Sequence, residues 1–168
     1  MSIEENWNRV SERVAEAAVK AGRDPSEITI VAVTKTHPAE TVEAALAAGV
    51  TDVGENRVQE FLSKESGVAS PCRWHLIGHL QTNKVNKVIG RFAMIHSVDS
   101  LKLAEKLSAA GKQEGVVTDI LVEVNTSGEE SKFGLETDTA LELCGDLSKL
   151  PALNLRGLMT VGPWVDDA

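Results

Sequence analysis

Tyrosine is absent from the 168 residues, and the only aromatic side chains are three tryptophans and three phenylalanines. No phenol of this chain can therefore act as an acid or base. The two cysteines, Cys72 and Cys144, lack the close spacing of metal ligands, so we expect no metal site. We expect both thiols to be reduced and the protein to be cytoplasmic. No apolar run reaches the roughly 20 residues of a membrane span, and residues 1–5 lack the basic start of a signal peptide.

Positive charge is also scarce. The chain has 17 Lys and Arg against 25 Asp and Glu, which gives a net charge of −8. Such a chain repels nucleic acid and anionic membranes, so we expect neither as a partner. The hydrophobic content of 42% is sufficient for a packed core, and the length predicts a single domain over residues 1–168.

Strand-like and helix-like segments alternate along the whole chain. Short runs of apolar and β-branched residues predict six strands, at residues 28–34, 51–54, 73–78, 93–98, 118–124 and 154–161. Amphipathic periodicity predicts helices at residues 4–21, 38–48, 56–62, 82–89, 100–109 and 137–150. This alternation is typical of parallel β-α units with right-handed crossovers.

Two α/β architectures fit this pattern: an open doubly wound sheet and a TIM-type (β/α) barrel. No GxGxxG or GxxxxGK loop follows a strand, which disfavours the first. Polar side chains end nearly every strand, and in a barrel they would meet at the face that carries active sites. These residues are Lys35, Glu55, Asn56, His79, Ser97, Asn125 and Thr160.

The number of strands does not complete a barrel. The repeat averages about 25 residues, and a closed barrel has eight β-α units. Two more units would need roughly 50 residues, whereas seven follow Val161. The sequence therefore predicts a barrel that lacks its last two β-α units. An open sheet exposes two edges, so we expect oligomerisation unless a partner or further chain covers them.

Lys35 is the main candidate for chemistry. It ends the apolar segment VAVTK, where partial desolvation would favour a neutral, nucleophilic amine able to form a Schiff base with an aldehyde. The alternative is a strand-end lysine whose ammonium simply reaches water. Lys132 is a second candidate amine. His75 and His79 lie about 13 Å apart on an extended strand, which is too far for one metal ion, so we interpret them as a structural and a loop histidine.

Several segments together resemble one known family. They are VAVTK (31–35), VGENRVQEF (53–61), WHLIGHLQTNKV (74–85), HSVDS (96–100), VEVNTSGEESKFG (122–134) and RGLMTV (156–161). The combination resembles the YggS family, which is the pyridoxal phosphate homeostasis protein family (PLPBP or PROSC). That family is similar to the N-terminal barrel of alanine racemase. The resemblance covers residues 28–161, and the combination of segments is specific where any one alone is not.

The resemblance implies a fold-type III barrel that binds pyridoxal 5′-phosphate. By it, Lys35 would hold the cofactor as a Schiff base, with Asn56 beside it, Met159 near the ring and Ile77 lining the pocket. The family is regarded as lacking robust catalysis; it is thought to bind the cofactor, deliver it to apo-enzymes and maintain vitamin B6 balance. Residues 162–168 depart from the family, whose last two β-α units carry Met-Ser-type and Arg-Ile-Gly-Thr-type segments that grip the cofactor phosphate.

Three other functions remain as alternatives. A racemase of the alanine type needs a tyrosine as its second base, which this chain does not supply. A cofactor-free aldolase could use Lys35 but leaves the segments around Asn56 and Ile77 unexplained. A purely structural protein would need no cluster of polar residues at its strand ends.

Overall fold

The computed structural model describes residues 1–129 and 133–162. They form two compact units. The first comprises residues 1–55 and 59–74, and the second comprises residues 56–58 and the described part of residues 75–168. The strand order is β1-β2-β3-β4-β5-β6, with β3 beginning in the first unit and ending in the second.

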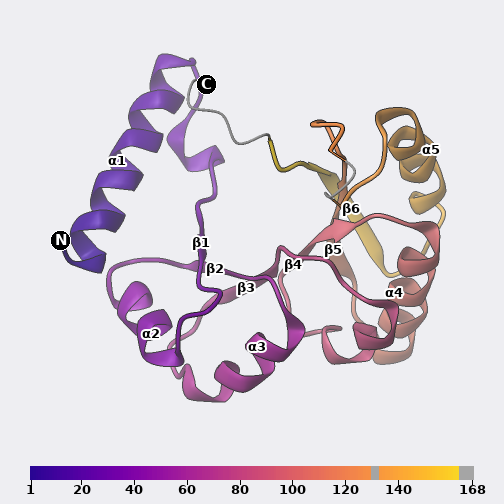
Figure 1. Cartoon of the computed structure of the whole chain (residues 1–168), viewed down its shortest axis with the longest axis horizontal. Helices are drawn as coiled ribbons and strands as arrows, with labels where there is room; N and C mark the ends of the chain where they lie inside the picture. Colours follow the sequence, from indigo (N-terminus) through magenta and orange to yellow (C-terminus); the bar gives the residue numbers. More distant parts are fainter. Residues whose placement is uncertain (130–132, 163–168) are drawn as a thin grey trace. The chain divides into compact units, whose positions relative to one another are not determined.

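The first unit combines three helices with the first strands (Figure 1). In chain order its elements are α1 (Ile3–Lys20), the 3₁₀ helix η1 (Pro25–Glu27), β1 (Val31–Val33), α2 (Ala39–Ala47), β2 (Asp52–Glu55), α3 (Val58–Lys64, all but Val58 in this unit), the 3₁₀ helix η2 (Glu65–Gly67) and the start of β3 (Arg73–Leu76). Strands β1 and β2 pair in parallel, with Val33 opposite Gly54. The buried core lies between α2 and β2 and consists of Val42, Ala45, Val50 and Val53.

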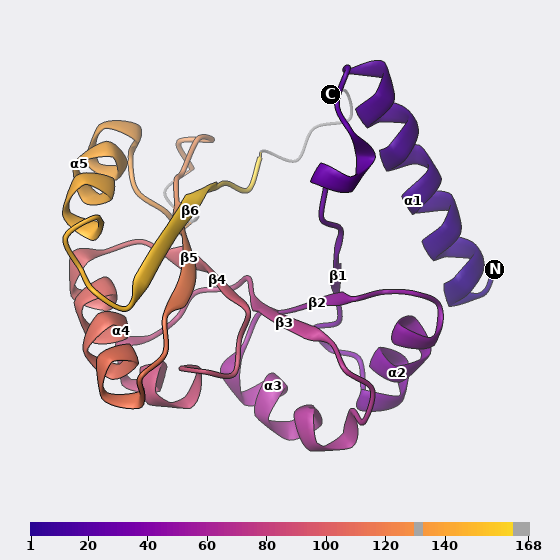
Figure 2. The same cartoon turned by 180° about the vertical axis from the view of Figure 1, so that it is seen from behind.

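The second unit continues the sheet. Its elements are the end of β3, the 3₁₀ helix η3 (Thr82–Lys87), β4 (Met94–Val98), α4 (Leu101–Glu114), β5 (Thr118–Glu123), α5 (Thr137–Leu147) and β6 (Leu153–Met159). The β3–β4, β4–β5 and β5–β6 pairs are parallel. Helices α4 and α5 lie on the same side of β5 and β6, as Figures 1 and 2 both show. Ile95, Ile120 and Val122 are completely buried in this part of the sheet.

The six predicted strands and their parallel arrangement are confirmed, but several boundaries differ. The sequence predicts a helix ending near residue 109, whereas α4 continues to Glu114 and ends at Gly115, which has a φ of +68°. Position 111 of this helix requires glycine, because a methyl group there would lie 2.9 Å from the Val116 carbonyl oxygen. The helix expected at residues 82–89 is the 3₁₀ helix η3.

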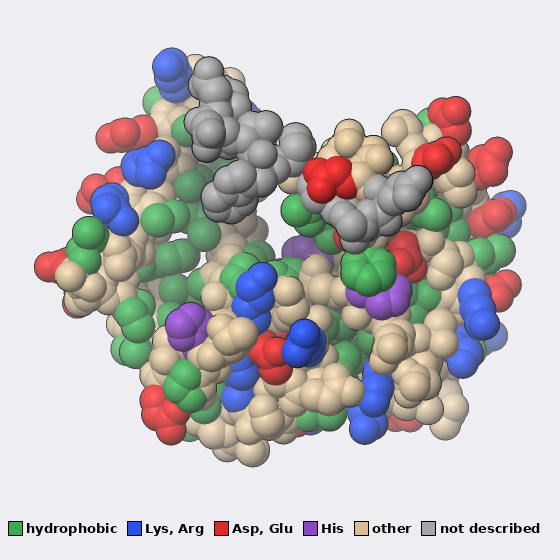
Figure 3. All heavy atoms as spheres, in the orientation of Figure 1, with side chains coloured by type: hydrophobic (Ala, Val, Ile, Leu, Met, Phe, Trp, Pro, Cys, Tyr) green, Lys and Arg blue, Asp and Glu red, His purple; other side chains and the backbone are tan. Residues whose placement is uncertain are grey.

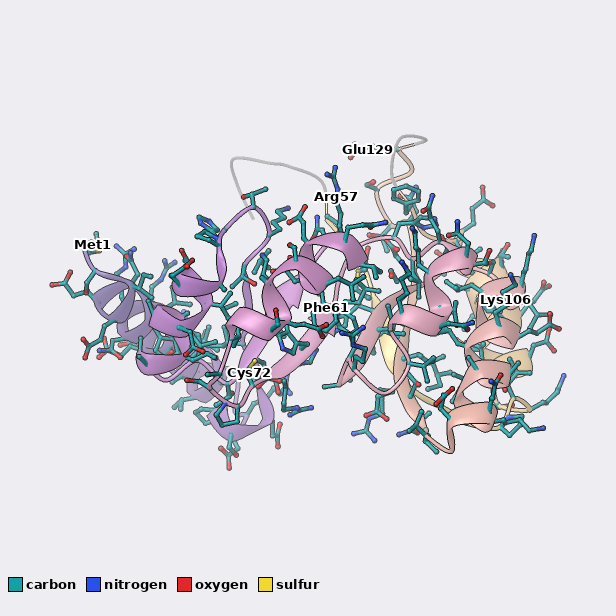
Figure 4. The ribbon with its side chains drawn as sticks, turned by 90° about the horizontal axis from the view of Figure 1, so that it is seen from below. Met1, Arg57, Phe61, Cys72, Lys106 and Glu129 are labelled. Atoms are coloured by element: carbon teal, nitrogen blue, oxygen red, sulfur yellow. The ribbon has the colours of Figure 1, made fainter. Side chains whose placement is uncertain are left out.

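The surface mixes charges of both signs. Figure 3 shows Lys and Arg side chains interspersed with Asp and Glu side chains on the face in view. Lys106 is one of the exposed cations and extends outward from α4 (Figure 4). Within the described part of the chain, no helix is both long and apolar enough to cross a membrane.

Candidate functional site

Lys35 lies on a tight turn at the carboxyl end of β1. The His37 amide donates to the Thr34 carbonyl oxygen at 3.1 Å, and Thr36 has a φ of +65°. A positive φ at the third position is the geometry of a type II turn, with Lys35 at the second position. The Lys35 side chain is exposed, so the partial desolvation expected from the sequence is wrong. Among the described residues no hydrogen bond or ion pair engages its amine.

A buried polar network holds the start of this turn. Thr34 donates through Oγ1 to Glu55 Oε1 at 2.6 Å, and Lys64 donates through Nζ to the same oxygen at 2.7 Å. Lys64 Nζ also donates to the Thr34 carbonyl oxygen at 3.0 Å. Because Val33 pairs with Gly54, Thr34 lies beside Glu55, one residue further along both strands. Glu55, one of the polar residues that end the predicted strands, therefore contacts α3.

A second connection to α3 holds the other side of Lys35. The Thr36 amide donates to Glu60 Oε2 at 2.9 Å. Helix α3 is itself anchored by the buried Phe61 (Figure 4). The Phe61 ring meets Trp74 edge-to-face, with ring centroids 5.2 Å apart. Both residues that flank Lys35 are thus bonded to side chains of one packed helix.

Asn56 and Ile77 belong to the second unit, and their segments lie together. A methyl group on Gly78 would come within 2.4 Å of the Asn56 carbonyl oxygen and 2.8 Å of its Cα, so only glycine allows this approach. Ser97, which is buried at the end of β4, donates through Oγ to the Gly78 carbonyl oxygen at 2.7 Å. Asn56 and Ile77 are both partly buried, and no described residue forms a hydrogen bond with the Asn56 side chain.

Met159 ends β6, opposite Glu123 of β5. Its carbonyl oxygen accepts from the Val124 amide at 2.8 Å. Three strand spacings separate β6 from β3, or about 14 Å along the sheet, so direct backbone contacts do not join Met159 to the Asn56 and Ile77 segments. Thr160, the next residue, lies 2.8 Å from Thr126 between hydroxyl oxygens, which links the end of β6 to the loop after β5.

The sequence analysis missed an acid–base cluster in the second unit. His79 Nδ1 lies 3.2 Å from Asp99 Oδ2, and the His79 ring stacks on Phe133 with centroids 4.4 Å apart. Burial raises the pKa of Glu123, and Asp99 raises it further, while His79 lowers it. The only available signal was that His79, Asp99 and Glu123 follow or end adjacent strands.

His75 is buried, as expected for a structural residue, and its partner is another histidine. His75 Nδ1 and His96 Nε2 lie 2.9 Å apart. Burial, with a smaller contribution from His75, lowers the pKa of His96 to about 4, so this ring is neutral at pH 7. Among residues 1–129 and 133–162, no group of three His, Cys, Asp or Glu side chains could hold a metal ion. Lys132 lies outside the described residues.

Comparison with known proteins identifies the family. The family "Alanine racemase, N-terminal domain" matches residues 2–168. The pyridoxal phosphate homeostasis protein of Pseudomonas aeruginosa is 42% identical over 161 residues, which cover 95% of this chain and 70% of that protein. The chain belongs to the pyridoxal phosphate homeostasis protein family.

Solved structures agree with this family assignment. PipY of Synechococcus elongatus, solved with pyridoxal phosphate bound, is 34% identical to this chain and has a TM-score of 0.79. The match covers 92% of this chain and 73% of the PipY chain. An alanine racemase of Clostridium difficile has a TM-score of 0.70 at 19% identity and covers 82% of this chain and 36% of its own. The second likeness shows the fold alone. The family fold is an α/β barrel, as the sequence predicts.

Proposed function

We propose that this protein binds pyridoxal 5′-phosphate and takes part in vitamin B6 homeostasis, with Lys35 holding the cofactor as a Schiff base. The observation that carries the proposal is the Lys35 amine, which is exposed, unengaged by any described residue and mounted on a turn bonded to α3 on both sides. Support also comes from PipY, a 34% identical protein solved with pyridoxal phosphate bound.

The residues at the turn fit the chemistry of an aldehyde cofactor. Lys35 would hold the cofactor through its amine nitrogen, replacing the aldehyde oxygen, which would be released as water. No oxidant or reductant is needed. When bound, the cofactor supplies an electron sink. Lys35 contributes the attachment point, and Glu55 and Lys64 stay buried in the network beneath it.

We propose supporting roles for the three other predicted site residues. Asn56 offers a partly buried amide with no hydrogen-bond partner among the described residues, which suits a polar substituent of the cofactor. Ile77 and Met159 are partly buried apolar side chains suited to the ring. We further propose that residues 1–168 act as one cofactor-binding domain, which is supported by the single family domain that matches residues 2–168.

Borohydride trapping tests the attachment point. Purified protein is mixed with pyridoxal phosphate, the Schiff-base absorbance is recorded, and the imine is reduced and mapped by peptide mass. We expect a pyridoxyl group on Lys35, and loss of both band and label in Lys35→Ala and in Lys35→Arg, which keeps the positive charge. Lys149→Ala removes an exposed lysine and should label like the wild type. Equal labelling of Lys35→Ala would reject the role of Lys35.

We propose that the bound cofactor is carried to apo-enzymes in the cytoplasm and is not used for racemisation. Support comes from the absence of tyrosine and from the two free thiols at Cys72 and Cys144, which suit a reducing compartment. Transfer is measured as activity gained by a pyridoxal-phosphate-dependent apo-enzyme, with Lys35→Ala as the control. Alanine racemisation at about 1 per second or faster would contradict a carrier.

We also propose that the 168-residue chain self-associates. In the described sheet β1 and β6 each pair with one strand only, and exposed strand edges favour association. Sedimentation equilibrium measures the mass in solution, and a stable monomer of 18.0 kDa would reject this part of the proposal.

A further inference from the structure

The Lys35 turn is attached to α3 by two separate connections. On one side, Lys64 donates to the Thr34 carbonyl oxygen and to Glu55, and Glu55 accepts from the Thr34 hydroxyl. On the other side, the Thr36 amide donates to Glu60 at 2.9 Å. The residue between the two connections is Lys35. The backbone is therefore bonded to α3 immediately before and immediately after the proposed attachment point.

The first connection is a buried ion pair between Glu55 and Lys64. Glu55 is completely buried, Lys64 is 6% exposed, and their charged atoms lie 2.7 Å apart. One carboxylate oxygen of Glu55, Oε2, is buried and has no hydrogen-bond partner among the described residues. Buried ion pairs are often no more stabilising than well-packed apolar residues of similar volume. What this pair adds is the hydrogen bond from Lys64 to the Thr34 carbonyl oxygen, which an apolar side chain could not form.

The second connection holds a backbone conformation that its residue disfavours. Thr36 has a φ of +65°, and a β-branched residue at positive φ is a genuine outlier that persists only where its surroundings enforce it. The Glu60 carboxylate supplies that enforcement by accepting the Thr36 amide hydrogen. The turn is therefore held in one conformation, although its side chains at positions 35–37 are exposed.

We propose that Glu55, Lys64 and Glu60 are positioning residues for Lys35. They fix the backbone on both sides of Lys35, so that its amine is presented within a narrow region before the cofactor arrives. Ordering the turn in advance removes an entropic cost from binding, which strengthens affinity. This inference rests on the proposed function, because it concerns how the same lysine captures the aldehyde.

Two sets of variants separate positioning from folding. Glu60→Ala removes the acceptor of the Thr36 amide, whereas Glu60→Gln keeps an acceptor oxygen at the same place. The double variant Glu55→Leu/Lys64→Met removes both buried charges together and keeps apolar bulk. Gln59→Ala is the matched control, because Gln59 lies on α3 next to Glu60 and is exposed. Circular dichroism and urea unfolding verify that each variant is folded.

The first measurement is cofactor capture. We expect Glu60→Ala and the double variant to bind pyridoxal phosphate at least tenfold more weakly than the wild type, with a diminished Schiff-base absorbance at equal cofactor concentration. Glu60→Gln should remain within about twofold, and Gln59→Ala should be unchanged. Folded Glu60→Ala and double variants with wild-type affinity and absorbance would overturn the inference.

The second measurement needs no cofactor. Amide hydrogen exchange by NMR reports the Thr36 amide, which we expect to exchange at least tenfold faster in Glu60→Ala than in Gln59→Ala. Equal exchange rates in these two variants would show that Glu60 does not hold the turn and would overturn the inference. If the wild type fails to attach pyridoxal phosphate at Lys35, the proposed function fails, and the exchange rates still decide whether α3 fixes the turn.

Discussion

The two units bury polar side chains by different means. In the first unit, Glu55 and Lys64 form an ion pair between β2 and α3. In the second unit, His75 and His96 form a hydrogen bond between adjacent strands, and the pKa of His96, lowered to about 4, keeps that ring neutral at pH 7. Burial penalises a charge severely unless an opposite charge is adjacent, whereas a neutral polar group needs only a hydrogen bond. The first cluster should therefore be sensitive to loss of one partner, and the second to acid.

The largest effect is expected from breaking the ion pair. Lys64→Met leaves Glu55 buried without its cation, which should lower the free energy of unfolding by about 3–5 kcal/mol. Lys149→Met, which removes a lysine from an exposed pair with Asp146, should cost at most about 1 kcal/mol. Urea denaturation measures both. Glu55→Leu/Lys64→Met should recover most of the loss, and failure to recover it would mean that the pair itself provides the stability.

Acid should act on the second unit through His96. The unfolded histidine has its ordinary pKa of 6.5 and the folded one about 4, so the unfolded state binds the proton first as pH falls. Stability is therefore complete above about pH 6.5 and declines toward pH 4, by at most about 3 kcal/mol because solvent screens a half-buried ring.

The contribution of His96 is isolated by substitution. His96→Gln should flatten the decline in unfolding free energy between pH 6.5 and 4, measured by urea denaturation at several pH values. His37→Gln alters an exposed histidine outside the cluster and should leave the decline unchanged. An equally steep decline in His96→Gln would assign the acid sensitivity to other groups.

The sequence predicts the architecture more completely than the polar networks. Six apolar runs are enough to predict the parallel strands, because strand patterns are local. Lys35 is a candidate for chemistry because it ends one of these runs. Lys64 follows the helix predicted at residues 56–62, and its burial against a carbonyl oxygen 30 residues earlier has no signal in the local sequence. Only the pairing of β1 with β2 reveals that Thr34 and Glu55 lie together beside α3.

A position at the end of a strand does not by itself predict the burial and contacts of a side chain. Glu55 and Asn56 both end the second strand, but alternation along the strand buries Glu55 against α3. Asn56 instead has its backbone against Gly78, a contact that depends on the missing Cβ of a residue 22 positions later. Such long-range steric requirements leave no periodic signal in a single sequence.

An intermediate effect is expected at this close approach in the second unit. In Gly78→Ala the new methyl group would lie 2.4 Å from the Asn56 carbonyl oxygen, so the backbone must shift. Overpacking of this kind costs about 1–3 kcal/mol. The displacement should also weaken pyridoxal phosphate binding if Asn56 contacts the cofactor, which a spectroscopic titration of the Schiff base measures.

Gly145→Ala provides the matched comparison for that substitution. Gly145 lies within α5, and a methyl group there meets no atom within 4 Å. Replacing a helical glycine by alanine should stabilise the protein by up to about 1 kcal/mol. Comparable destabilisation by Gly78→Ala and Gly145→Ala would show that the approach to Asn56 is not the cause.

The smallest effect should come from Glu123, a buried carboxyl that differs from Glu55 in lacking a bonded cation. In residues 1–129 and 133–162 no hydrogen bond reaches its side chain. Its pKa is raised, chiefly by burial, so the unfolded state ionises first as pH rises, and stability falls across that interval above pH 4.5. Glu123→Gln removes this titration and should raise the melting temperature more at pH 8 than at pH 5. Glu142→Gln, at an exposed position on α5, should show no such difference. If Glu123→Gln changes the melting temperature equally at pH 5 and pH 8, as expected for Glu142→Gln, then ionised Glu123 is not destabilising. The contrast with Glu55, which is bonded to its cation, then disappears.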